Sequence, residues 1–168
     1  IAEAEDYFSN NSERLAQWHQ CLRCSAFFRD EASRRFNLLL ELFREDAFDE
    51  QLDAEHYNAC VSTLFTLPHN VFDQKLRQLR AKTMMRLIWR DVNRLGNMPS
   101  ITQELSHFAC ASIYAALNYH NTALCEKHGE PKNTQGETQH LFVLGMGKLG
   151  ADELNLSSDI DLIFCYPD

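Results

Sequence analysis

The sequence predicts a mostly α-helical chain, in which a helical region precedes the first strand–helix–strand unit of an α/β domain. Three observations support this prediction. Apolar residues recur at helical spacing through residues 1–128. Residues 129–139 are polar, contain glycine and proline and lack apolar periodicity, which is typical of a linker. Residues 140–168 contain short continuous apolar runs separated by turns, as buried strands do.

The composition is that of an ordinary globular protein. Of the 168 residues, 45% are hydrophobic and 24% are charged, and the formal net charge is −8. An acidic chain is a poor candidate for non-specific binding to a nucleic-acid backbone, which needs clustered Lys and Arg. No apolar run approaches the roughly 20 residues that span a bilayer, and the acidic start is no signal peptide. We therefore expect no nucleic-acid or membrane partner, and the missing initiator Met suggests a chain that begins inside a longer one.

The six cysteines show no complete metal-ligand pattern. Cys21 and Cys24 have CxxC spacing, but a zinc site of this kind needs a second pair later in the sequence, which this sequence lacks. We interpret all six as reduced thiols of a cytoplasmic protein. The histidines at 107, 120 and 128 form no evident ligand set, and Trp18 and Trp89 are expected in the core.

In the first half, short helices are expected near residues 11–28 and 54–66. A further helix is indicated by apolar residues at i, i+3, i+4 and i+7, namely Phe36, Leu39, Leu40 and Phe43. A long apolar stripe then follows Pro68 and runs from Leu76 to Leu95. Its predicted stop consists of Gly96, Asn97 and Pro99.

The same long stripe carries basic residues at every fourth position: Lys82, Arg86, Arg90 and Arg94. Two interpretations are open. This basic ridge faces a nucleotide or an acidic partner, or it is a solvated helix face with i,i+4 ion pairs, which we favour. After the stripe, Ser100 and Gln103 resemble a capping box that opens another long helix. Its predicted buried face consists of Leu105, Phe108, Ala109, Ser112, Ile113, Ala116 and Leu117.

The C-terminal part begins with a predicted strand at Leu141–Leu144. The glycine-containing segment Gly145–Gly150 breaks this strand, Ala151–Leu156 suits about two turns of helix, and a second strand is predicted at Asp161–Tyr166. Two strands do not form a stable independent sheet. Either this pair packs on the helical region or the protein continues beyond residue 168, and we favour the second alternative.

Asp159 and Asp161 flank one residue at the predicted second strand. Side chains alternate along a strand, so both carboxylates point to the same face. Such a pair suits Mg²⁺, which prefers oxygen ligands and commonly bridges carboxylates to substrate phosphates. Alone, the pattern is weak, because alternating surface aspartates are common. Upstream, however, Gly147 and Lys148 follow an apolar strand, where a glycine turn lets backbone N–H groups approach a phosphate.

Two nucleotide-binding motifs fit less well. Gly145, Gly147 and Gly150 match GxGxxG, but the dinucleotide fingerprint expects an acidic residue about 20 positions further on, after a full helix. Here the helix is too short and the acids lie at the start of the strand. The pattern GxxxxGK[ST] fails, because Leu149 follows Lys148.

The run from Leu144 to Phe164, LGMGKLGADELNLSSDIDLIF, resembles the glutamine synthetase adenylyltransferase family, whose pattern is roughly GxGKLGGxELxxxSDxDLIF. Members of this family are bifunctional enzymes with two nucleotidyltransferase domains of the DNA polymerase β type. Asn155 is similar to the N-terminal copy, because the C-terminal copy usually has glycine there. The resemblance implies that the α/β part is the start of such a domain, and that it belongs to the deadenylylase half.

By this resemblance, the enzyme removes AMP from a tyrosine of glutamine synthetase by phosphorolysis, which releases ADP. Asp159 and Asp161 would be the catalytic residues that hold Mg²⁺. The nucleotide (ATP or ADP) and phosphate would bind at Gly145, Gly147, Lys148, Ser157 and Ser158. The implied partners are glutamine synthetase and, in the full-length enzyme, a regulatory protein of the PII type.

Two departures from the family pattern matter. Ala151 replaces a usual glycine, which is a mild change unless the residue needs a positive φ. The fold's third metal carboxylate lies on a later strand, so we expect this chain to be inactive alone.

Three classes of function stay open: the deadenylylase half, another polymerase β-like nucleotidyltransferase acting on a small molecule or RNA end, and a non-catalytic helical interaction module. A longer sequence with a third Asp and a second GKLG…SDxD copy would favour the first class. A single copy would favour the second, and the lack of a third carboxylate would favour the last.

Overall fold

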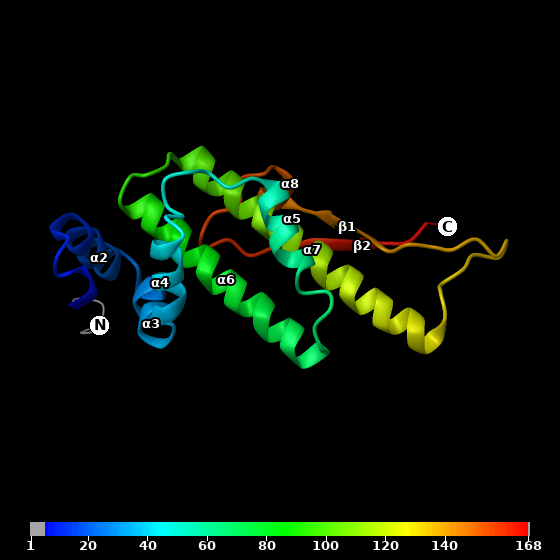
Figure 1. Cartoon of the computed structure of the whole chain (residues 1–168). Helices are drawn as coiled ribbons and strands as arrows, with labels where there is room; N and C mark the ends of the chain where they lie inside the picture. The colour runs from blue at the N-terminus through cyan, green and yellow to red at the C-terminus, as the bar shows by residue number, and fades with distance from the viewer. Residues whose placement is uncertain (1–5, 168) are drawn as a thin grey trace. The chain divides into compact units, whose positions relative to one another are not determined.

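A computed structural model describes residues 6–167 (Figure 1). Most of these residues are helical, which confirms the mostly α prediction, and the sheet found among them has two strands. In the same range no helix has the length and apolar character needed to cross a membrane. The chain forms two compact units. One comprises the residues up to Leu52 with Pro68–Ile101, and the other comprises Asp53–Leu67 with the residues from Thr102 onward. The predicted helical region contributes to both units, and the predicted linker limits of 129–139 stay a prediction.

Among the described residues, the first unit contains the helices α2 (Ser12–Cys24), α3 (Ala26–Arg34), α4 (Phe36–Arg44) and α6 (His69–Val92). Helical structure expected near 11–28 is present, and it is divided between α2 and α3. Ser25 explains the break, because its backbone is extended (φ −133°) and its side chain accepts the N–H of Phe28. That bond caps the N-terminus of α3, as Ser residues commonly do.

An aromatic cluster forms the core of the first unit. Trp18 and Trp89 are 1% and 0% exposed, which confirms their predicted burial. Phe36 and Phe43 of α4 are half-buried and pack edge-on against Trp18 and Trp89 respectively. The fully buried side chains of α4 are Leu38, Leu39 and Leu42. The helix was predicted correctly, but its buried face is centred on these leucines because the aromatic residues flank it.

Helix α6 ends earlier than the apolar stripe predicts. Its last residue is Val92, and Arg94 adopts a left-handed backbone with φ 58°. The N–H of Leu95 donates to the carbonyl of Arg90 at 2.8 Å, and the N–H of Arg94 donates to that of Asp91 at 3.1 Å. This is the Schellman arrangement, which usually has glycine at the left-handed position. The predicted stop at Gly96 was wrong because an arginine takes that role two residues earlier.

Helix α7 (Met98–His128) begins before the predicted capping box. The side-chain oxygen of Asn97 accepts the N–H of Ser100 at 2.9 Å, so Asn97 caps the helix and Ser100 lies in its first turn. Pro99 also belongs to this first turn, where its missing N–H costs nothing. The residues predicted to stop the preceding helix therefore start the next one.

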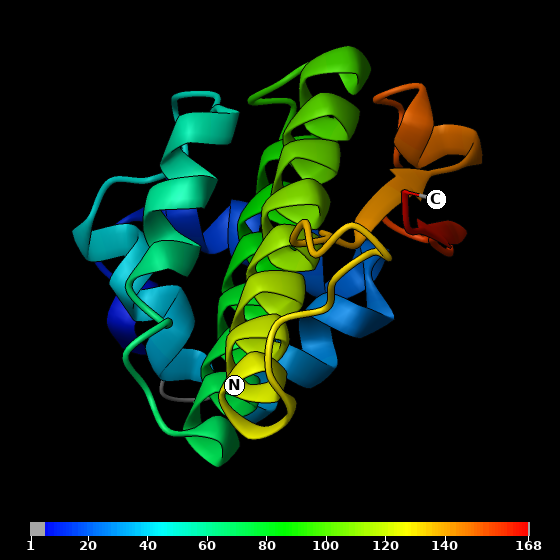
Figure 2. The same cartoon turned by 90° about the vertical axis from the view of Figure 1, so that its right-hand side faces the viewer.

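The second unit contains α5 (Ala54–Ser62), most of α7, β1 (Phe142–Gly145), α8 (Gly147–Gly150) and β2 (Leu162–Cys165). Helix α5 and the strand pair lie on different sides of α7 (Figure 2). The hydroxyl of Tyr57 donates to the buried carboxylate of Glu104 at 2.7 Å, and its ring packs edge-on against Phe108. The hydroxyl of Tyr119 donates to the carbonyl of Leu67 at 2.6 Å. These contacts fix α5 and the segment after it on α7.

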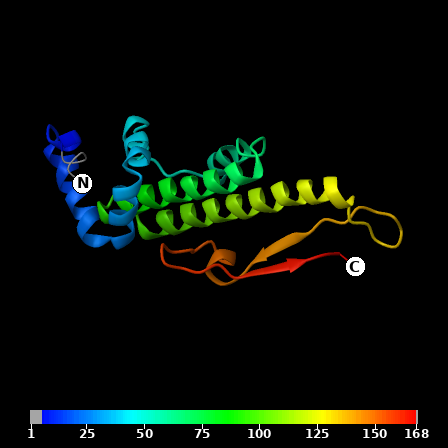
Figure 3. The same ribbon diagram turned by 90° about the horizontal axis from the view of Figure 1, so that it is seen from below.

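The two strands form an antiparallel pair that runs alongside α7 (Figure 3). Their register joins Phe142 to Cys165 and Gly145 to Leu162. Both predicted strands are therefore present, with ends that differ by one residue. Leu144 and Ile163 pair across the two strands and are 48% and 45% exposed, whereas Phe142, 46% exposed, borders the groove beside α7.

The helix predicted at Ala151–Leu156 was wrong, because these residues form turns and irregular structure. Asp152 has a left-handed backbone with φ 60°. The side-chain oxygen of Asn155 accepts hydrogen bonds from the N–H of Ser157 and the hydroxyl of Ser158, at 3.1 and 2.8 Å. Asn and Ser side chains that bind nearby backbone compete with helix formation in this way.

Candidate active site

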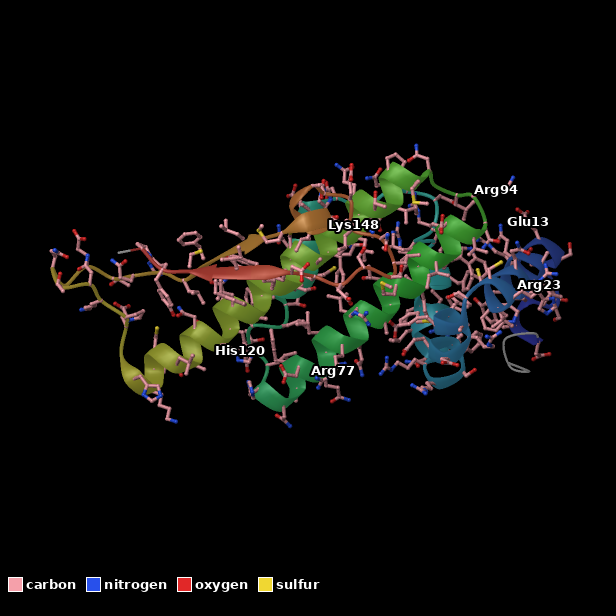
Figure 4. The ribbon with its side chains drawn as sticks, turned by 180° about the vertical axis from the view of Figure 1, so that it is seen from behind. Glu13, Arg23, Arg77, Arg94, His120 and Lys148 are labelled. Carbon is pink, nitrogen blue, oxygen red and sulfur yellow. The ribbon has the colours of Figure 1, made fainter. Side chains whose placement is uncertain are left out.

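The glycine turn after β1 folds tightly onto the end of that strand. Gly147 has a left-handed backbone with φ 57°, which glycine adopts at little cost. A Cβ at Gly150 would lie 2.5 Å from the carbonyl oxygen of Gly145, so this position has no room for a side chain. Lys148 is exposed on the one-turn helix α8 (Figure 4). The turn thus presents a cation and close-packed backbone at the end of a strand.

Ala151, which replaces a usual glycine of the family pattern, has an ordinary backbone with φ −93°. The position does not need a positive φ, so the methyl group of alanine causes no backbone strain. This departure leaves the shape of the turn intact.

The acidic pair lies beside the glycine turn. The N–H of Met146 donates to the carbonyl of Asp161 at 2.9 Å, which extends the strand ladder one residue beyond β2. Alternation then places Asp161 on the same face as Ile163 and Leu144, the face turned away from α7. Asp159 precedes it by two residues, and both side chains are exposed. The structure therefore brings the predicted acids to the turn, at the entrance to β2 rather than inside it.

The donor set at these two positions consists of exposed carboxylates, which fit a hard cation such as Mg²⁺. Among residues 6–167, no group of three or more His, Cys, Asp or Glu side chains is arranged to hold a metal ion. Protein groups from this range would thus supply two carboxylates, and Mg²⁺ commonly completes its coordination with water and substrate phosphates.

Ser157 and Ser158 take part in the turn that leads to Asp159. Their hydroxyls donate to the side-chain oxygen of Asn155 at 3.2 and 2.8 Å. The N–H of Ser158 also donates to the carbonyl of Asn155 at 3.0 Å. These bonds set the direction in which the chain approaches the acids. Nucleotide binding by the two serines stays a prediction.

Helix α7 anchors the segment between the glycine turn and the acids. The buried hydroxyl of Ser106 accepts the N–H of Leu154 at 3.0 Å. A nitrogen of the His107 ring lies 3.7 Å from the carboxylate of Asp152, and the side chains of Leu149 and Leu154 are buried. Sequence patterns did not single out Ser106. The only hint in the sequence was a hydroxyl-bearing residue within an apolar helical stretch. Burial and the nearby carboxylate of Asp152 also raise the pKa of the Cys110 thiol.

An open groove of about 550 Å³ lies between α7 and the strand pair. From the strands, Val143, Gly145 and Leu162 line it, and from α7 it is lined by Ile113, Tyr114, Leu117 and Asn118, among others. Strand alternation places Asp161 on the opposite face. The groove is therefore separate from the acidic pair.

The basic ridge lies within the first unit, and its two middle residues are internal. Arg86 and Arg90 are 2% and 3% exposed. Arg86 donates to the backbone carbonyls of Ala47 and Glu50, and Arg90 donates to that of Leu95 at 3.4 Å. Neither a nucleotide-facing surface nor the favoured solvated face describes these two residues. The four-residue spacing shows that these residues share one face of a helix, but it does not show whether that face is exposed. Here the face is covered at Arg86 and Arg90.

The outer members of the ridge differ from the two buried arginines. The ammonium of Lys82 lies 2.9 Å from the carboxylate of Glu45 and 3.4 Å from that of Glu41. Arg94 is exposed beyond the end of α6, and Figure 4 shows it and Arg77 toward opposite ends of that helix. The ridge therefore consists of one ion-paired lysine, two internal arginines and one exposed arginine.

Comparison with known proteins identifies the family. The family model of glutamate-ammonia ligase adenylyltransferase matches residues 15–168. Similar curated proteins, each named bifunctional glutamine synthetase adenylyltransferase/adenylyl-removing enzyme, occur in Mannheimia haemolytica (50% identity over 160 residues), Thioalkalivibrio sulfidiphilus (40% over 144) and Acinetobacter baylyi (59% over 91). The matches cover 94%, 84% and 54% of this chain, and 16%, 15% and 10% of those relatives. The chain belongs to the glutamate-ammonia ligase adenylyltransferase family.

Proposed function

We propose that this chain supplies part of the AMP-removing half of a bifunctional enzyme that regulates glutamine synthetase. In this reaction phosphate attacks the phosphorus of the AMP attached to a tyrosine, the bond to the tyrosine oxygen breaks, and ADP leaves. The supporting observation is the hydrogen bond from Met146 to Asp161, which brings the glycine turn and the acidic pair together at one end of the strand pair.

Each part of this site suits one task in phosphoryl chemistry. The exposed carboxylates of Asp159 and Asp161 would hold Mg²⁺, which supplies charge stabilisation at the reacting phosphate. Lys148 is an exposed point charge that can pair with phosphate oxygens. Gly147 leaves its backbone open to close approach by a ligand, because no atom lies within 4 Å of the position that a Cβ would take, whereas Gly145 packs against Leu149 and shapes the turn. The polymerase β-like domain, in which a later strand carries a third carboxylate, is part of the same proposal.

The assignment to the AMP-removing half depends on Asn155. Its side chain organises the turn before the acids through the hydroxyls of Ser157 and Ser158. Glycine, which is usual at this position in the other copy of the family pattern, cannot form these bonds. The turn of the other half would lack these bonds, and on this ground we assign the chain to the N-terminal half.

The decisive experiment replaces both acids, Asp159→Asn with Asp161→Asn, in the full-length protein. AMP removal from adenylylated glutamine synthetase should fall by about two orders of magnitude or more, because a preorganised electrostatic contact to the reacting group is lost. AMP attachment, which the other half would perform, should persist.

A charge-matched control replaces two exposed acids of the first unit, Asp30→Asn with Asp49→Asn, and both activities should survive. Equal loss of removal and attachment in the Asp159/Asp161 variant would contradict the assignment to the N-terminal half. Loss of neither activity would favour a different nucleotidyltransferase or a non-catalytic interaction module.

A further inference from the structure

Ser106 occupies an unusual place for a polar side chain. It lies inside helix α7 and is 0% exposed. Its hydroxyl donates to the carbonyl of Thr102 at 2.9 Å and accepts the N–H of Leu154 at 3.0 Å. A hydroxyl can make both bonds at once, because it has one proton to donate and lone pairs to accept with. The second bond joins α7 to a segment 48 residues away along the chain.

Leu154 lies midway between the two parts of the proposed site. Before it come the glycine turn and Lys148, whose carbonyl accepts the N–H of Glu153 at 2.8 Å. After it come the Asn155 turn and the acids, and the N–H of Met146 binds Asp161. The two ends of the segment from Met146 to Asp161 are thus joined by a hydrogen bond. Ser106 holds the middle of this segment against a rigid helix.

The hydrogen bond between Ser106 and Leu154 is buried, so bulk water cannot take the place of the hydroxyl when the hydroxyl is removed. Leu154 is 3% exposed and its side chain packs inward, as that of Leu149 does. A buried N–H without an acceptor carries a desolvation penalty. The backbone relieves that penalty by moving until the N–H finds another acceptor, and any such movement shifts the chain on both sides of Leu154.

We propose that Ser106 is a positioning residue for the nucleotidyl-transfer site, acting through the backbone of Leu154. It would fix the spacing between Lys148 and the Asp159–Asp161 pair, so that metal and phosphate are held at the same time. This inference rests on the proposed function. Small misplacements of groups that hold a reacting centre reduce the rate strongly, and a shift of about 1 Å can cost about 100-fold.

The test compares Ser106→Ala with Ser112→Ala in the full-length protein. Ser112 is a matched control, because its hydroxyl donates to the carbonyl of Phe108 at 2.8 Å and so makes the same bond within α7. In Ser106→Ala, we expect kcat for AMP removal to fall about 10-fold or more, with KM for adenylylated glutamine synthetase unchanged. The Mg²⁺ concentration that gives half-maximal rate should rise several-fold, by analogy with other supporting contacts of metal ligands. Ser112→Ala should retain wild-type values.

A second measurement detects the bond between Ser106 and Leu154 independently of enzyme activity. Hydrogen exchange of the segment from Leu149 to Leu156 in the full-length protein should accelerate in Ser106→Ala and stay unchanged in Ser112→Ala. Equal kinetics and equal exchange in the two variants would overturn the positioning role. If Asp159→Asn with Asp161→Asn loses AMP removal in the same series, the proposed function stands and this inference alone has failed. If that variant keeps AMP removal, the function on which the inference rests has failed.

Discussion

Arg86 places a permanent charge inside the first unit, where it binds backbone carbonyls. It donates to the carbonyls of Ala47 and Glu50, in the segment that follows α4. Carbonyl groups in a buried loop need hydrogen-bond donors, and a guanidinium offers several in a fixed geometry. The sequence predicted Arg86 on a surface, whereas its charge organises the loop after α4.

We expect Arg86→Met to lower the free energy of unfolding by about 2–4 kcal/mol, because the carbonyls it binds lose charged donors. Urea denaturation of the 168-residue chain measures this change. Arg77→Met is the control, since Arg77 is an exposed residue of the same helix, and it should change stability by less than about 0.5 kcal/mol. Equal effects of the two substitutions would show that the loop does not depend on Arg86.

Cys21 is a buried thiol of the same unit, and burial raises its pKa to about 12. In the unfolded chain the thiol ionises near the ordinary value of 9.0, whereas the folded chain keeps the proton. The unfolded state therefore binds fewer protons in this range, so the free energy of unfolding falls as pH rises from 9 toward 12, by up to about 1.4 kcal/mol per pH unit.

Urea denaturation of the chain at pH 8 and pH 10 tests this expectation. Cys21→Ala should reduce the loss of stability between the two pH values. Cys24→Ala, which changes an exposed thiol of the same helix, should keep most of that loss, because the charge of Cys24 raises the pKa of Cys21 less than burial does. The same dependence in all three proteins would exclude Cys21 as its source.

At the level of elements, the turn between β1 and α8 depends on a close approach of two backbone segments. Gly150→Ala would place a methyl group 2.5 Å from the carbonyl oxygen of Gly145. Since this contact is with backbone, the turn must shift, and we expect a cost of about 1–3 kcal/mol in urea denaturation. AMP removal by the full-length variant should fall as well.

Ala151→Gly is the matched control for this turn, because Ala151 has an ordinary φ of −93°. It should retain activity and lose at most about 1 kcal/mol through the added freedom of the unfolded chain. If Gly150→Ala behaves like this control, the turn does not need glycine at position 150.

The same scale shows what the sequence could predict. Helices and strands followed from apolar spacing, because that spacing reflects which side of an element is buried. Ends and turns were predicted less well. Arg94 takes a backbone usual for glycine, and Asn97 caps α7 ahead of the predicted Ser100. For the candidate site, the pattern singled out the segment containing Gly147 and Asp161, whereas the bond of Ser106 joins distant segments that no local pattern records.

At the scale of the whole molecule, the described residues provide a strand pair with an uncovered apolar face. Two strands alone are marginally stable, and this pair is held by α7 through Ser106 and the buried leucines at 149 and 154. The chain spans 10–16% of the length of the relatives it matches. Activity is therefore expected of the longer protein.

We expect the 168-residue chain alone to show no phosphorolysis of adenylylated glutamine synthetase, because the site would lack a third metal carboxylate. Release of ADP from adenylylated glutamine synthetase with phosphate and Mg²⁺ measures this activity. The full-length protein, assayed at the same molar concentration, is the positive control. Turnover by the short chain would show that two carboxylates suffice.

The bond between Ser106 and Leu154 also has a consequence for how the family can vary. The helix contributes a side chain and the loop contributes only its main chain, so the restriction on residue type falls on one partner. Position 154 can exchange one apolar residue for another and still offer the same N–H. Position 106 cannot lose its hydroxyl without losing the bond. Evolutionary restriction would therefore reach well upstream of the acidic motif, into a helix whose sequence gives no sign of the chemistry.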